Sequence, residues 1–327
     1  MFEGVAHTST RQETETGVSE QLNDLALCQH TLNQEIRCQG IGLHTGRDVS
    51  MTLLPAPAGT GIVFRRLDIP GPGGIIPARY DLVAEAAMCT RLMNDANVSV
   101  YTVEHLMAAL YSCGVDNLFI ELDGPEVPVM DGSAAPFVRM IKTQGLRAQP
   151  FPRRVITVRR AVEARKGQAY ARLAPGSGLS LKMEIDFSDP AIGAQALALD
   201  MNEDVFRREL ATARTFGFIA DVESLQQKGL ARGASLDNAV GIADGRVVNP
   251  GGLRFPDECV RHKMLDCIGD MALSGGLIQG RYHGVKASHA VNNLLLRALF
   301  ADSANWSVNT VSESSTPSFR ELQAASA

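Results

Sequence analysis

A histidine and an aspartate one helical turn apart offer the clearest chemistry in this chain of 327 residues. His262 and Asp266 lie in the segment 257–271, whose apolar residues recur with helical spacing after a proline–aspartate start. Residues four apart on a helix share one face, with Cβ atoms about 6 Å apart. An imidazole nitrogen and a carboxylate oxygen at that spacing could bind one zinc ion. A surface ion pair or a helix-capping cluster is the alternative that the spacing alone leaves open.

A second histidine occupies the matching place in an earlier segment of similar pattern. The string VEHLMAAL contains Glu104 and His105, and the string VRHKMLDC contains His262. Each half of the chain ends in helix, strand, helix, which suggests a duplication with two similar layers packed face to face. Ligand sites tend to lie in clefts between such layers. His105, His262 and Asp266 would then be three protein ligands, and a catalytic zinc needs three ligands and one open position.

Other polar residues could complete a hydrolytic site around such a metal. Glu104 could take a proton from the attacking water, as the glutamate of a HExxH helix does. His289, at the start of the last expected helix, could be a general acid if Asp270 stabilises its protonated form. The hydroxyl of Thr215 could donate to a developing oxyanion, and His44 in a glycine-flanked turn could face a ligand. The alternatives are a solvated His–Glu pair, an inert helix-start histidine, a buried strand-end threonine and a strand-end histidine.

The composition restricts the class of protein. A formal net charge of −5 argues against a nucleic-acid partner. No run of 18 apolar residues could span a membrane, and the first residues lack the pattern of a secretory signal. The 6 cysteines form no CxxC pair, so we expect reduced thiols in a cytoplasmic protein rather than metal ligands.

The order of expected strands and helices, which is similar in the two halves of the chain, predicts an α+β fold of two similar domains. Each would be a β-sheet with helices on one face, and the two would pack as a sandwich with the active site between them. A proline-rich polar stretch near residue 150 is the best boundary. We therefore expect a disordered extension at 1–27, domain I at 28–150, domain II at 151–302 and a polar tail at 303–327.

Several long strings resemble one known family. TVEHLMAAL, DGPEVPVMDGSAAPF, ARTFGF, LRFPDECVRHKMLDCIGD and GVKASHAVNN occur in the order found in the UDP-3-O-acyl-N-acetylglucosamine deacetylase (LpxC) family, over roughly residues 31–300. The resemblance implies a cytoplasmic, zinc-dependent amidohydrolase of lipid A biosynthesis in Gram-negative bacteria. Its substrate would be UDP-3-O-(3-hydroxyacyl)-N-acetylglucosamine, and its products acetate and UDP-3-O-acyl-glucosamine.

By position, the resemblance implies roles for individual residues. The family's zinc ligands, general base, acid with its supporting carboxylate, and oxyanion donor fall on His105, His262, Asp266, Glu104, His289, Asp270 and Thr215. Its substrate-contacting lysine falls on Lys263, its aromatic beside the sugar on Phe216, and its aromatic against the uracil on Phe187.

The acyl chain of the family's substrate lies in a passage built from an insert. Here that insert covers about residues 216–235, and Phe218, Val222 and Leu230 are apolar enough to line the passage. Ala231 and Arg232 depart from the expected pattern, so the preferred acyl length stays open.

Two rival functions remain beside this one. A zinc hydrolase could act on another N-acyl sugar, or a nucleotide-sugar-binding regulator could have lost its chemistry. A regulator has no need of the acid and base that Glu104 and His289 would supply, which speaks against it. The expected partner is the UDP-linked acylated amino sugar, and we expect a monomer.

Overall fold

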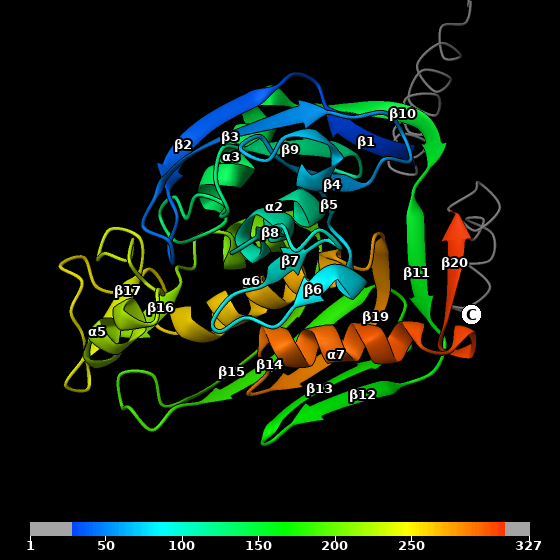
Figure 1. The fold of residues 1–327 in the computed structure, drawn as a ribbon. Coiled ribbons are helices and arrows are strands. Elements are labelled where there is room, and N and C mark those ends of the chain that lie inside the picture. Colours follow the sequence, from blue (N-terminus) through cyan, green and yellow to red (C-terminus); the bar gives the residue numbers. More distant parts are fainter. Residues whose placement is uncertain (1–27, 311–327) are drawn as a thin grey trace, which may run out of the picture.

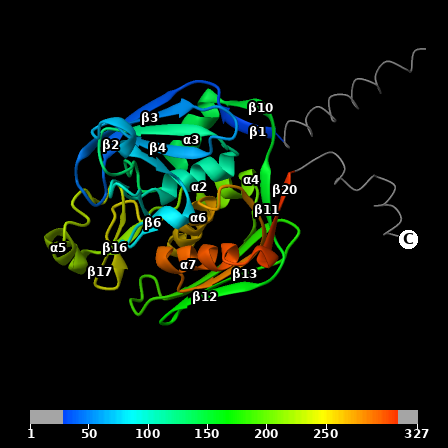
Figure 2. The same ribbon diagram turned by 45° about the vertical axis from the view of Figure 1, so that its right-hand side comes forward.

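The structure, a computed structural model, describes residues 28–310. Two β-sheets form its outer layers, and helices from both halves of the chain lie between them, as Figures 1 and 2 show. The inner helices are α2 (Glu104–Cys113), α3 (Ala135–Gln144), α6 (Glu258–Ala272) and α7 (His289–Phe300). Each half contributes a sheet with helices on one face, which confirms the predicted α+β sandwich.

The sheet of the first half buries alternate side chains against α2 and α3. In β3 (Asp48–Pro55), the side chains of Val49, Met51 and Leu53 are buried, whereas those between them are not. The five-stranded sheet has the order β2-β3-β9-β4-β5, with β2 (Ile36–Ile41), β9 (Leu118–Leu122), β4 (Ile62–Arg66) and β5 (Ile75–Pro77). Two small sheets accompany it: β1 (Cys28–Leu32) with β10 (Leu146–Pro152), and β6 (Val83–Ala84) with β7 (Arg91–Met93) and β8 (Ser99–Val100). Short 3-10 turns occupy Gly71–Gly74 and Tyr80–Leu82.

The larger sheet of the second half is organised around β19 (Leu277–Val285). The first residues of β19 pair with β11 (Arg154–Val158), and the later ones pair with β13 (Ala169–Ala174) and β14 (Leu179–Asp186) on its two sides. The outer strands are β12 (Val162–Lys166), β15 (Ala194–Asp200) and β20 (Trp306–Thr310). A helical segment follows β15, with α4 (Glu203–Val205) and a π-helical turn (Phe206–Leu210). The expected insert folds as β16 (Phe216–Phe218), α5 (Ile219–Gln227), β17 (Val240–Ala243) and β18 (Arg246–Val247).

The helices α2 and α6 cross at very close range. A Cβ atom built on Gly269 of α6 would overlap the carbonyl group of Glu104 at the start of α2. Only a glycine allows two backbones to approach so closely. This crossing brings the first turn of α2 against the face of α6 that carries His262 and Asp266.

One expected boundary needs correction. We placed residues 303–327 in a polar tail, but Ser303–Asn305 form a 3-10 turn and β20 pairs antiparallel with β11 along its whole length. The segment is polar because β20 lies at the edge of the sheet, where side chains reach solvent. The residues 311–327, and the expected extension at 1–27, lie outside the described residues.

The partners of consecutive strands change near residue 150, where we expect the boundary between the two domains. β10 pairs with β1 of the first half, and β11 pairs with β19 of the second. The division at residue 150 itself stays a prediction. Between residues 28 and 310, the structure has no helix long and apolar enough to cross a membrane.

Candidate active site

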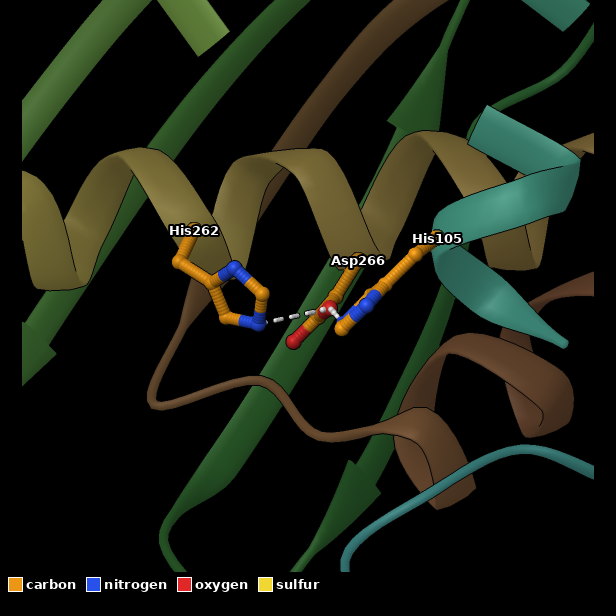
Figure 3. A group of neighbouring side chains, drawn as sticks. All are labelled: His105, His262 and Asp266. Atoms are coloured by element: carbon orange, nitrogen blue, oxygen red, sulfur yellow. Dashed lines mark ion pairs between the residues drawn. The ribbon is translucent and has the colours of Figure 1, made fainter. Parts of the chain in front are cut away.

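The three expected metal ligands meet at the crossing of α2 and α6. One donor atom from each of His105, His262 and Asp266 lies within 4.8 Å of the other two. The Nε2 atoms of His262 and His105 are 3.3 Å and 3.6 Å from Asp266 Oδ1. Figure 3 shows the carboxylate between the two imidazole rings, with His105 reaching over from α2. All three side chains are buried, and they come from both halves of the chain.

The chemistry of this donor set fits a divalent cation such as zinc. Burial and the neighbouring His262 lower the pKa of His105 to about 3, and burial also lowers the pKa of His262. Both imidazoles are therefore neutral and hold a free lone pair. His262 Nδ1 donates to the carbonyl of Ala213 at 3.0 Å, which leaves Nε2 as the donor toward a metal.

Asp266 supplies the negative charge of the set. Burial alone would raise the pKa of Asp266, but nearby positive charges, including Lys263 and His289, outweigh it and hold the pKa far below its usual range. Lys263 Nζ donates to Asp266 Oδ2 at 2.8 Å, while the buried Oδ1 has no hydrogen-bond partner among the described residues. A buried carboxylate oxygen without a hydrogen-bond donor, between two neutral imidazoles, is a donor arrangement that fits a divalent cation.

A carboxylate and an imidazole flank His105, His262 and Asp266, which are the ligand set of the candidate metal site. Glu104 lies next to His105 in the sequence and is buried, and its Oε1 is 3.7 Å from His289 Nε2. The same His289 nitrogen lies 3.9 Å from Asp266 Oδ2. On its other side, His289 Nδ1 lies 3.0 Å from Asp270 Oδ2. His289 therefore lies between the ligand set and Asp270.

The pKa values of Glu104 and His289 are both raised, but for different reasons. Burial raises the pKa of Glu104 to about 7, although the neighbouring His289 opposes it. Burial alone would lower the pKa of His289, but the carboxylates of Asp270 and Glu104 outweigh it and raise the pKa to about 9. Between these values, Glu104 is charged and can accept a proton, while His289 carries one to give.

The segment that carries Thr215 is fastened to α6 and to the first half. Arg214 forms a buried ion pair with Glu258 of α6, with Nε 2.9 Å from Oε1, and its backbone N–H donates to the same oxygen. The backbone N–H of Thr215 donates to the carbonyl of Gly132 at 2.8 Å. These bonds, with that of Ala213 to His262, fix the backbone on both sides of the half-buried Thr215.

The expected substrate contacts divide into two groups. Phe187 packs against Phe216 and Phe218, with ring centroids 5.6 Å and 6.2 Å away, and Phe216 lies 6.3 Å from the His262 ring. This half-buried aromatic cluster borders the ligand set. Val222 on α5 and Leu230 just after it are half-buried, and their role against an acyl chain stays a prediction.

Comparison with known proteins decides the family. The family model described as "LpxC: UDP-3-O-acyl N-acetylglycosamine deacetylase" matches residues 29–301. Three relatives carry the name UDP-3-O-acyl-N-acetylglucosamine deacetylase. That of Phenylobacterium zucineum is 48% identical over 87% of this chain and 97% of its own length. That of Idiomarina loihiensis is 45% identical over 87% and 94%, and that of Myxococcus xanthus is 48% identical over 84% and 87%.

The chain belongs to the UDP-3-O-acyl N-acetylglycosamine deacetylase family. The resemblance inferred from its strings is confirmed, and the match covers both layers of the sandwich. All the residues that contribute to the site described above lie within the matched range.

Within this deacetylase fold, sequence reasoning missed a buried carboxylate that orders the turn of His44. Glu126, which is fully buried, accepts from the backbone N–H groups of His44 and Thr45 and from the hydroxyl of Thr102. It fixes the turn that carries His44, whose buried Nε2 has no partner among the described residues. The one available signal was an acid between two prolines in an otherwise apolar loop.

Two further polar residues were missed because their partners are distant in sequence. Thr90 contacts both Glu104 and Asp270, and Asn292 donates to Asp270 from α7. Thr90 lies directly before β7 and Asn292 lies on α7, so no local spacing places either residue beside Asp270.

Proposed function

We propose that this chain removes the acetyl group of UDP-3-O-(3-hydroxyacyl)-N-acetylglucosamine by hydrolysis, giving acetate and UDP-3-O-acyl-glucosamine. The observation that carries the proposal is the pairing of Glu104 and His289 within 4 Å of each other beside three converging metal ligands. Membership of the deacetylase family supplies the substrate. The proposal also covers cytoplasmic action in lipid A biosynthesis.

His105, His262 and Asp266 would hold one zinc ion. A zinc ion bound there supplies Lewis acidity to the amide carbonyl and to the attacking water. Glu104 accepts a proton from that water, because its carboxylate is charged above a pKa of about 7. His289, protonated below a pKa of about 9, donates to the amide nitrogen as the C–N bond breaks.

Charge that develops on the carbonyl oxygen needs donors close to the ligand set. The hydroxyl of Thr215 is suited to donate to it, because hydrogen bonds fasten its backbone to Gly132 and fasten the preceding residues to α6. Asp270 keeps His289 in its protonated form.

We assign the binding of substrate to the surroundings of the ligand set. Burial lowers the pKa of Lys263, but Asp266 raises it by more, so the ammonium group stays charged. It would contact polar groups of the substrate. Phe216 would lie beside the sugar, and Phe187 would stack on the uracil, since both belong to one aromatic cluster. Phe218, Val222 and Leu230 would line the passage for the acyl chain.

A substrate panel tests the proposal against its rival, a zinc hydrolase of another N-acyl sugar. Acetate release is measured for UDP-3-O-acyl-N-acetylglucosamine, for UDP-N-acetylglucosamine without the acyl chain, and for the acylated sugar without UDP. We expect rapid release only from the first compound. Equal kcat/KM values for all three compounds would contradict the proposed specificity. Acetate release from none of them would contradict the proposed function.

A further inference from the structure

We propose that Thr90 is a positioning residue that orients two carboxylates at once. One is Glu104, the proposed base, and the other is Asp270, which supports the proposed acid His289. The inference rests on the proposed roles of Glu104, Asp270 and His289. The backbone of Thr90 contacts Glu104, and its hydroxyl contacts Asp270. Among the described residues, Thr90 forms no hydrogen bond with the ligand set or with His289.

Thr90 is buried, with 2% of its surface exposed, at the start of β7 and beneath the first turn of α2. Its backbone N–H donates to Glu104 Oε2 at 3.0 Å. Its carbonyl accepts from the N–H of Val103, the residue that precedes α2, at 3.4 Å. The backbone of Thr90 thus fixes both the carboxylate of Glu104 and the point at which its helix begins.

The hydroxyl of Thr90 reaches across to the second half of the chain. It donates to Asp270 Oδ1 at 2.5 Å, a bond between residues 180 positions apart. The other oxygen, Oδ2, accepts from the side chain of Asn292 at 2.8 Å. Tyr282 in turn donates to Asn292 Oδ1 at 2.7 Å, so Asn292 is itself held in one orientation.

With one donor on each oxygen, the carboxylate of Asp270 cannot turn about its last bond. Both of its oxygens lie near His289 Nδ1, at 3.2 Å and 3.0 Å, so its orientation sets the direction of the imidazole. The imidazole in turn presents Nε2 toward Glu104. Removing the Thr90 hydroxyl frees one oxygen of Asp270 and lets the ring swing away from the reacting groups.

The test separates the hydroxyl of Thr90 from its backbone. Thr90→Val keeps the shape and the bond to Glu104 but removes the donor to Asp270, whereas Thr90→Ser keeps both. We expect Thr90→Val to lower kcat about tenfold or more, the scale of one hydrogen bond to a charged group, with little change in KM. Thr90→Ser should recover most of the turnover. Zinc content, measured by metal analysis, should stay at one per chain in both variants.

A matched control is Thr31→Val. Thr31 is fully buried on β1, which contributes no residue to the site described above, and its hydroxyl donates to the carbonyl of Asn117 at 2.7 Å. This change should lower the thermal unfolding temperature and leave kcat unchanged. If Thr90→Val behaves in the same way, Thr90 is merely structural and the inference is wrong.

Combining Thr90→Val with Asp270→Asn distinguishes a failure of this inference from a failure of the proposed function on which it rests. The double variant Thr90→Val/Asp270→Asn should be no slower than Asp270→Asn alone, because the hydroxyl acts through that carboxylate. Independent, multiplying losses would overturn the role of Thr90. Full activity of Asp270→Asn itself would instead overturn the proposed role of Asp270. Should Thr90→Val not fold, Thr90→Ala with the same double variant carries the test.

Discussion

Glu104 and His289 face each other as two groups whose protonation follows from their surroundings. Burial raises the pKa of Glu104 to about 7, and two carboxylates raise that of His289 to about 9 against the effect of burial. The proposed mechanism needs Glu104 deprotonated and His289 protonated. Both conditions hold together only between the two pKa values.

The dependence of kcat/KM on pH should therefore be a bell with limbs at about 7 and about 9. The rate falls below the first value because Glu104 gains a proton, and above the second because His289 loses one. Asp270→Asn should move the alkaline limb to lower pH, since it removes a charge that favours protonated His289. A profile without an alkaline limb, or an unchanged limb in Asp270→Asn, would contradict the assignment of the acid.

The convergence of the candidate metal ligands could be predicted from sequence where their spacing is local. His262 and Asp266 share one helical face, and His105 occupies the matching place in the other half. The positions of Thr90 and Asn292 around Asp270 could not be predicted in this way. Their contacts join segments from different halves or different elements, and no periodicity along the chain encodes them.

At the scale of the elements, the approach of α6 to α2 decides whether ligands from two halves can meet. Gly269→Ala would place a methyl group against the Glu104 carbonyl, where neither backbone can move freely. We expect a loss of about 1–3 kcal/mol in the free energy of unfolding, and a lower kcat because Glu104 is displaced. Denaturant unfolding and turnover measurements check both effects.

Gly178→Ala is the control for that change. A Cβ built at Gly178 meets no atom within 4 Å, so its stability should stay within about 1 kcal/mol of the wild type. If Gly269→Ala were equally harmless, the close crossing would not be a real constraint on the site.

The buried ion pair of Arg214 and Glu258 fastens the Thr215 segment to α6. Burial would raise the pKa of Glu258, but the hydrogen bonds and charge of Arg214 outweigh it, so the pKa is lowered. Glu258→Gln leaves a buried guanidinium without its counter-charge, and should cost about 3 kcal/mol or more of unfolding free energy. Because the pKa of Glu258 is lower in the folded state, the stability it adds is present at neutral pH and lost as the pH falls through that value.

Asp204→Asn provides the comparison for Glu258→Gln. Asp204 pairs with Arg207 at 3.0 Å, but the two side chains are 77% and 62% exposed. Such a pair contributes about 0–1 kcal/mol, so chemical unfolding should barely change. An equal loss in both variants would mean that the buried pair does not fasten this segment.

Local pattern and long-range pairing explain which elements could be predicted. The helix around His262 was predicted within a residue or two, because its proline–aspartate start and its apolar spacing are continuous in the sequence. The strand β20 was missed, because its polar residues are typical of a loose end and its ordering comes from pairing with β11. Tertiary pairing of this kind overrides local composition.

The whole molecule is two similar layers, and both contribute residues to the candidate metal site. His105 belongs to the first half, whereas His262 and Asp266 belong to the second. Binding of zinc should therefore stabilise the packing of the halves as well as the site. The predicted sandwich explains why similar helices from both halves end up face to face, as Figure 1 shows.

Removal of the metal should lower the thermal unfolding temperature. Free zinc at about 100 times its dissociation constant adds about 2.7 kcal/mol to a folded state that alone binds it. Thermal unfolding of chelated and zinc-supplemented protein measures the difference. The variant Asp266→Ala, which lacks the charged ligand, should show little response to zinc. A wild-type unfolding temperature that ignores zinc would argue against a shared site.

The most direct test of the account follows acetate release and zinc content together in the wild type and in Glu104→Gln. The wild-type protein should lose activity on chelation and regain it when one zinc per chain is restored. Glu104→Gln should bind the same amount of zinc but release acetate at least about 100-fold more slowly, because the ligands remain and the base is gone. Acetate release that persists in the chelated protein, or near-normal turnover by Glu104→Gln, would contradict a zinc site served by that base.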